Sequence, residues 1–130
     1  MKGIRGSAKR KPISTFQFIL DELFGLDVRT RPMFGCTAVY VGEKIVLVFC
    51  DRDKMKNDIG IWVCIPNTFC QEMKRSFPAL RGVSFFANEN SAWQCLPQAH
   101  PDFEELALEL SKMIRSKDPR IGRIPKTKRK

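Results

Sequence analysis

The strongest constraint on the fold is a stretch of twenty residues, from Arg31 to Cys50, that carries little charge in a basic chain. It reads RPMFGCTAVYVGEKIVLVFC and is rich in β-forming residues without a helical period. Gly42-Glu43 divides it into two runs, which predicts a tight hairpin. In the second run Ile45, Leu47 and Phe49 would face one side of a sheet, and Val46, Val48 and Cys50 the other. Because both sets are apolar, this strand is expected to be central, or covered on its second face.

Three further segments show apolar residues at helical spacing. The first begins at Ser14, where STFQ has the form of a capping box, and ends near Gly25. The second follows a similar box at Thr68 and ends before Pro78, and the third opens at Pro101-Asp102. The three apolar stripes consist of Phe16, Ile19, Leu20, Leu23 and Phe24; Phe69, Met73 and Phe77; and Phe103, Leu106, Leu110 and Met113.

The remaining segments predict strands. One runs from Arg29 to Val41 and one from Ile59 to Ile65, while GVSFFA and SAWQCLP form a hairpin around residues 88–90. The expected order is helix, three strands, helix, two strands, helix. This order predicts an α+β fold of two layers, with an antiparallel five-stranded sheet and helices on one face. Residues 13–116 would form one domain, flanked by basic tails at 1–12 and 117–130.

The second face of this sheet needs a cover. Its expected side chains include Val46, Val48, Trp62 and Cys64, and burial of each such side chain is worth about 1.5–3 kcal/mol. Two solutions are open. The chain forms a homodimer or binds a partner protein through this face, or its own C-terminal tail docks there through Ile121 and Ile124.

The net charge of +9 is concentrated at the two ends of the chain. Residues 1–12 hold five basic residues and no acid, and residues 113–130 hold eight against Asp118, so the middle is mildly acidic. Such ends either neutralise phosphates without reading bases or serve only as solubilising tails. The candidate nucleic-acid-binding residues in them are Lys9, Arg10, Lys11, Lys126, Lys128, Arg129 and Lys130. On the first strand, Arg29 and Arg31 either contact phosphate or pair with Asp27 or Glu22, and pairing is the favoured interpretation.

Other functional classes find little support. The five cysteines, Cys36, Cys50, Cys64, Cys70 and Cys95, have no CxxC spacing, and His100 is the only histidine. The sequence therefore predicts neither a disulfide scaffold nor a metal site, and Cys36 is expected to be a packing residue. His100 is expected to mark a helix entry, and Glu104, Glu105 and Glu109 a solvated helix face. No nucleotide-binding or hydrolase motif is present, so neither an enzyme nor a cofactor is expected.

The chain is expected to be cytoplasmic. It has no run of the roughly 18 apolar residues that a membrane-spanning helix needs. The positive start, MKGIRGSAKRKP, is not followed by the apolar region of a signal peptide. No membrane partner is therefore expected.

Several segments resemble the YjbR/MmcQ family and the related TfoX N-terminal domains. They are RPMFG before a strand, YVGEKIVLVF, GIWVCIP, RSFPALR, and the closing SAWQCLP, HPDFEELALELSKMI and DPRIGRIP. The resemblance covers residues 14 to 125 and implies a two-layer fold with the element order given above. The family is labelled as predicted DNA-binding, with a double-wing motif. Cys36 stands where many relatives have a second glycine after MFG, so a backbone contact that needs both glycines does not carry over.

The sequence thus leaves two main hypotheses. The first is a small cytosolic YjbR-like protein that binds DNA non-specifically through its basic termini. The second is a protein-interaction or dimerisation module without catalytic activity. The predicted hairpin tips, at Glu43-Lys44 and at residues 88–90, each carry an acid and are expected to be ordinary solvated turns rather than wings.

Overall fold

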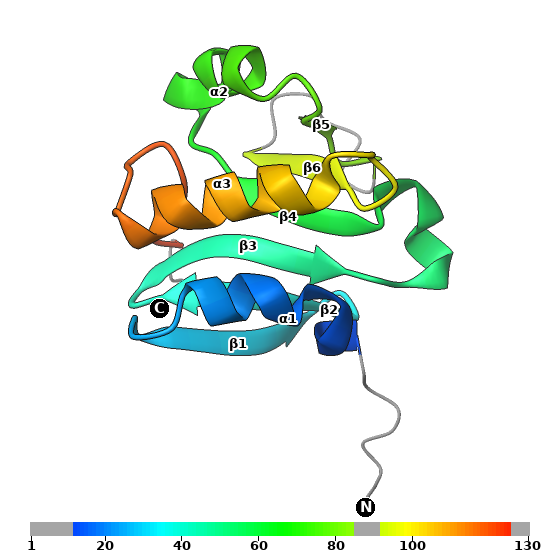
Figure 1. The fold of residues 1–130 in the computed structure, drawn as a ribbon, viewed down its shortest axis with the longest axis horizontal. Helices are drawn as coiled ribbons and strands as arrows, with labels where there is room; N and C mark the ends of the chain where they lie inside the picture. The colour runs from blue at the N-terminus through cyan, green and yellow to red at the C-terminus, as the bar shows by residue number, and fades with distance from the viewer. Residues whose placement is uncertain (1–11, 85–91, 126–130) are drawn as a thin grey trace, which may run out of the picture.

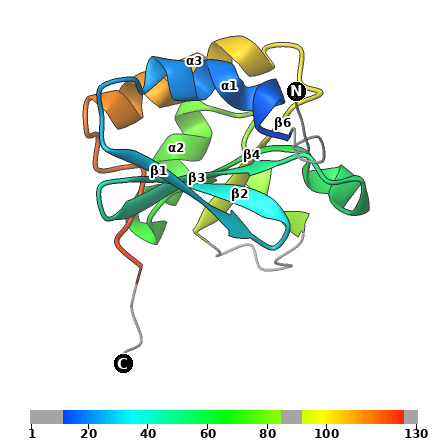
Figure 2. The same cartoon turned by 90° about the horizontal axis from the view of Figure 1, so that it is seen from below.

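The computed structural model describes residues 12–84 and 92–125, with side chains from Phe16 onward. The elements are α1 (Pro12–Glu22), β1 (Val28–Met33), β2 (Cys36–Val41), β3 (Lys44–Cys50), the 3-10 helix η2 (Asp53–Asp58), β4 (Gly60–Cys64), the 3-10 helix η3 (Asn67–Phe69), α2 (Cys70–Ser76), β5 (Arg81–Gly82), β6 (Trp93–Pro97) and α3 (Phe103–Arg115). They form an open antiparallel sheet in the order β1-β2-β3-β4-β6-β5. Helices α1 and α3 lie side by side over one face of this sheet, and α2 lies toward its β4–β6 side (Figures 1 and 2).

The predicted α+β class is confirmed, but the sheet has six strands instead of five. The segment from Arg29 to Val41 was expected to be one strand, and it forms the two strands β1 and β2. The turn between them places Phe34 at φ 55° and Gly35 at φ 78°. A two-residue hairpin turn of type I′ requires positive φ at both central positions. This turn is difficult to predict from the sequence, because bulky residues such as Phe34 rarely adopt positive φ.

Both predicted capping boxes are wrong. Helix α1 begins at Pro12, so Ser14 lies inside it and not at its N-cap. Thr68 lies within η3, and α2 begins only at Cys70, without a side-chain cap. The short 3-10 turn shifts the start of α2 beyond the position that the sequence pattern indicates.

The two-residue turn at Gly42-Glu43 is confirmed, with Gly42 at φ 61° and with Val41 paired to Lys44. Beyond the turn, a bulge shifts the register between β2 and β3, so Tyr40 pairs with Ile45 and Val39 with Leu47. Because a bulge adds one residue, it reverses the alternation of side chains on one side of it. Val46 therefore packs in the helix-side core and Ile45 on the second face, which corrects the predicted assignment of these two residues.

The helix-side core lies between the sheet and the two long helices. Phe16 of α1 stacks on Phe49 of β3 at 5.1 Å between ring centroids, and it meets Phe103 of α3 edge to face at 6.1 Å. Phe24 was expected in the α1 stripe, but the helix ends at Glu22 and Phe24 is 83% exposed.

The second face of the sheet is buried within the single chain. Its ten buried residues, each at most 7% exposed, form a cluster that we call the second-face cluster. They are Cys36, Ala38, Ile45, Val48, Cys50, Trp62, Cys64, Val83, Trp93 and Cys95. The second face therefore offers no open apolar surface that would favour a homodimer. The hairpin expected at residues 82–97 is represented by the pairing of β5 with β6, and its tip lies outside the described residues.

The C-terminal segment docks, but not as expected. The backbone of Arg123 exchanges two hydrogen bonds with Ile45, at 2.9 and 3.2 Å, and the amide of Gly122 donates to the carbonyl of Cys64 at 2.7 Å. Ile121 packs into the helix-side core, whereas Ile124 is 62% exposed. Residues 121–123 thus lie against the start of β3 and the end of β4. Ile121 and Ile124 do not cover the second face.

Candidate functional site

The turn between β2 and β3 separates two recesses in the surface of the protein. The first, which we call the lysine pocket, has a volume of about 450 Å³ and lies beside Asp27, Lys44 and Lys117. The second, which we call the arginine groove, has a volume of about 660 Å³ and lies beside Arg29 and Arg31. Gly42 lines both recesses.

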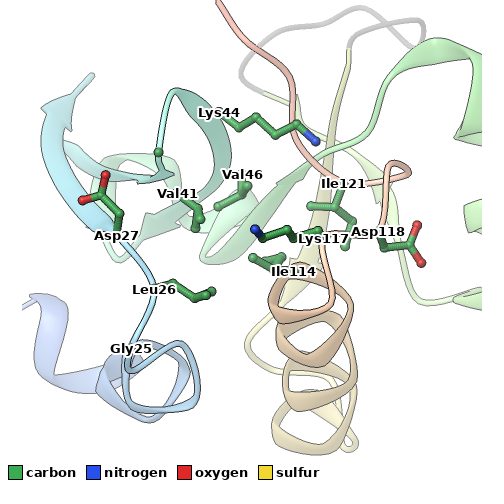
Figure 3. A pocket seen from close by; sticks show the side chains of 11 residues that line it. Gly25, Leu26, Asp27, Val41, Lys44, Val46, Ile114, Lys117, Asp118 and Ile121 are labelled. Carbon is green, nitrogen blue, oxygen red and sulfur yellow. The ribbon is translucent and has the colours of Figure 1, made fainter.

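The lysine pocket has an apolar floor and charged walls. Its floor is contributed by the connection between α1 and β1, by β2, β3 and α3, and by the C-terminal segment. The residues are Leu26, Val41, Val46, Ile114 and Ile121. The ammonium groups of Lys44 and Lys117 reach over this floor, whereas the carboxylates of Asp27 and Asp118 point away from it (Figure 3). Among the residues that the structure describes, neither lysine forms an ion pair. This composition suits an anion that also carries an apolar group.

Lys117 reaches the pocket because of the way in which α3 ends. The amide of Lys117 donates to the carbonyl of Ile114 at 2.9 Å, and the amide of Asp118 donates to that of Met113 at 3.0 Å. These two bonds form a Schellman motif, which places Lys117 in the left-handed conformation with φ 64°. Glycine is the usual residue at that position, so Lys117 holds a strained backbone at the wall of the pocket.

Part of the predicted C-terminal charge is already neutralised within the fold. Arg120 contacts the carboxylate of Asp118 at 2.7 Å and that of Glu72 at 2.8 Å. Its hydrogen bonds hold the pKa of Asp118 below the usual aspartate range. Arg115 donates to the carbonyls of Glu22 and Phe24, which are left free at the end of α1. These two arginines therefore have structural roles, and Lys117 and Arg123 remain without ion pairs among the described residues.

The arginine groove lies at the edge strand β1. The guanidinium of Arg29 donates to the carbonyl of Gly42 at 3.0 Å, and that of Arg31 lies over the ring of Tyr40, 5.9 Å from its centroid. Neither guanidinium pairs with a carboxylate in the part of the chain that the structure describes, so the favoured interpretation, pairing with Asp27 or Glu22, is wrong. β1 is exposed at its four central residues, so both arginines are accessible.

The structure relates Arg29 and Arg31 to one of the two basic ends. Ile124 and Pro125 line the same groove, and the next residue in the chain is Lys126. Lys9, Arg10, Lys11, Lys126, Lys128, Arg129 and Lys130 themselves lie outside the described residues. The described chain begins (dark blue) at the end of α1 that lies farthest from the described C-terminal segment (red), as Figures 1 and 2 show.

Sequence reasoning missed Lys44 and Lys117 as members of this site. Lys44 was set aside because Glu43 is its neighbour, and Lys117 was assigned to a tail. The positive φ of Lys117 follows from a helix end whose sequence, RSKDP, lacks the glycine that marks most such ends. Only the fold brings these lysines to the turn beside the two arginines.

The residues considered for catalysis occupy structural positions. Nδ1 of His100 accepts a hydrogen bond from the amide of Asp102 at 3.0 Å, which confirms its position at a helix entry. Glu104, Glu105 and Glu109 are exposed, as expected, and Cys36 is buried. No group of three or more His, Cys, Asp or Glu residues within 12–84 and 92–125 is arranged to hold a metal ion. Within the same ranges, no helix has the length and apolar character needed to cross a bilayer.

Comparison of the chain with protein-family models, with curated proteins and with solved structures found no match.

Proposed function

We propose that this chain is a small cytoplasmic YjbR-like protein that binds the phosphate backbone of DNA without reading its sequence. The observation that carries the proposal is the cluster of four cations around the β2–β3 turn. Arg29 and Arg31 lie on one side of the turn, Lys44 and Lys117 lie on the other, and none has an ion pair among the described residues. We call these four residues the turn cations. The proposal assigns no catalysis to the chain.

The position of the turn cations supports phosphate binding. Residues two apart on a strand project from the same face and are about 6.8 Å apart, so Arg29 and Arg31 can contact successive phosphates of one strand. Arginine also binds phosphate in a bidentate manner. Pro125 leads from the groove directly into Lys126, Lys128, Arg129 and Lys130, so these residues extend the same contact. Lys9, Arg10 and Lys11 supply a second, separate contact.

The test is a salt series of affinities for a duplex of mixed sequence. For Z phosphates neutralised, log Kd changes with log salt with a slope of about 0.9Z. Arg29→Ala/Arg31→Ala should reduce this slope by up to about 1.8 and weaken binding to unrelated duplexes equally. Lys44→Ala/Lys117→Ala should have a similar effect, and removal of residues 126–130 a larger one.

The matched control is Lys74→Ala/Arg75→Ala, which removes two exposed cations from α2 and lies away from the turn. It should change the slope much less than either turn double variant. If all three double variants behave alike, the binding follows net charge alone and the assigned surface is wrong. If the full chain shows no salt-dependent binding, the function itself is wrong.

A further inference from the structure

Three sulfur atoms converge at one end of the second-face cluster. Cys36 is the first residue of β2, Cys50 is the last residue of β3, and Met55 belongs to η2. The thiols of Cys36 and Cys50 each donate to Sδ of Met55, with S···S distances of 3.9 Å in both cases. The pairing of Thr37 with Phe49 places the two cysteines at the same end of neighbouring strands. The three sulfurs therefore form a triangle drawn from three separate elements.

The two sides of this triangle that meet at Met55 have the length expected in a metal coordination site. Three sulfur donors arranged in a plane around a metal, at a bond length of about 2.3 Å, are about 4.0 Å from one another. The Cys36–Met55 and Cys50–Met55 sides are both 3.9 Å long. Along these two sides, the sulfur atoms already have the spacing that a bound ion requires.

The donor chemistry is selective. Two thiolates and a thioether form a soft donor set, which favours Cu(I), whereas zinc sites use cysteine, histidine and carboxylate ligands. The sequence predicted no metal because the spacing of cysteine and histidine gives no zinc site. The third donor here is a methionine, and Met55 lies at a kink in η2, with φ −119° and ψ 43°.

The surroundings supply the charge that such a site needs. Two thiolates and Cu(I) carry one negative charge, and Arg52 lies beside them. Its guanidinium rests against Gly35, where a Cβ would be 2.0 Å from Nη1, and its Nε is buried without a hydrogen-bond partner among the described residues. To bind, the metal must displace the two thiol protons.

We propose that Cys36, Cys50 and Met55 form a three-sulfur site for one Cu(I) ion. Binding forms three Cu–S bonds and releases the two thiol protons to solvent, without any change in oxidation state. Arg52 balances the resulting negative charge. The site lies on the sheet face opposite the helices and is independent of the turn cations.

The test is an anaerobic titration of the reduced full chain with Cu(I) in competition with bicinchoninate. One ion should bind per chain, with affinity that falls as the pH is lowered. X-ray absorption should show three sulfur neighbours at about 2.3 Å. Cys36→Ala and Cys50→Ala should each abolish the one-to-one complex, and Cys64→Ala, a buried cysteine of the same face, should retain it.

Met55→Leu decides the outcome, because a methionine-to-leucine exchange conserves volume and largely preserves the fold. It should weaken Cu(I) binding by at least about tenfold. Met73→Leu is the matched control, because it removes a buried thioether from α2 without touching the site. Equal affinity of the two leucine variants would overturn the proposal, as would nitrogen or oxygen donors in the absorption spectrum. The same comparison decides the question if a cysteine variant does not fold.

Discussion

At the scale of single residues, Lys117 is an exposed residue with a strained backbone conformation. It is one of two non-glycine residues with positive φ in the described chain, together with Phe34. The left-handed conformation costs an L-residue about 1–2 kcal/mol, and glycine avoids this cost. A lysine at this position brings an ammonium group to the wall of the pocket, where a glycine would leave only backbone.

Replacement of Lys117 by glycine should therefore stabilise the protein. Relief of the strain exceeds the entropy cost of a new glycine, about 0.4–1 kcal/mol, so we expect a gain of about 0.5 kcal/mol or more. Urea denaturation measures the change. Lys112→Gly, on the exposed helical turn before it, is the control and should lose about 1 kcal/mol. A loss of similar size in both variants would show that Lys117 is not strained.

At the scale of elements, the sheet depends on a close approach of β4 to the segment at the end of β6. Gly60 has φ 146°, and a Cβ there would lie 2.2 Å from the carbonyl oxygen of Leu96. That oxygen belongs to the backbone of a paired strand, so it cannot move aside without disturbing the ladder. A glycine is therefore required where β4 begins.

Gly60→Ala should destabilise the protein by about 3 kcal/mol or more, because it adds both a backbone clash and an unfavourable φ. Thermal and urea denaturation should show a large decrease in the melting temperature and in the free energy of unfolding. Gly82→Ala provides the comparison, since nothing lies within 4 Å of a Cβ at that position. It should change stability by no more than about 0.5 kcal/mol. Similar behaviour of the two variants would contradict the described pairing of β4 with β6.

The elements also show how far the sequence alone can predict this fold. The period of the apolar residues located the helices and most strands, and it assigned Leu47, Val48, Phe49 and Cys50 to the correct faces. It misassigned Ile45 and Val46, because a bulge is a property of the pairing between two strands and leaves no mark in either one.

The candidate sites were less predictable for a related reason. Arg29 and Arg31 were identified as candidates from the sequence. Their partners, Gly42 for Arg29 and Tyr40 for Arg31, depend on the pairing of β1 with β2. The sulfur triangle joins residues from three elements and includes a methionine, so no spacing rule for cysteine and histidine detects it.

At the scale of the whole molecule, the burial of both sheet faces within one chain predicts a monomer. All ten residues of the second-face cluster are nearly inaccessible without a partner subunit. Light scattering should therefore give a mass of 15.0 kDa. The mass should not change between about 0.15 and 1 M salt, a range over which the electrostatic screening length falls from about 8 to about 3 Å. A stable mass of twice that value would show that an interface exists elsewhere on the surface.

The turn at Gly42 is held from both directions. Its amide donates to the carbonyl of Asp27 at 2.9 Å, on the side of the lysine pocket, and its carbonyl accepts from Arg29, on the side of the arginine groove. The turn thus separates the lysine pocket from the arginine groove and is hydrogen-bonded on both sides. Because Gly42 lines both recesses, a molecule bound in either one would contact the same turn.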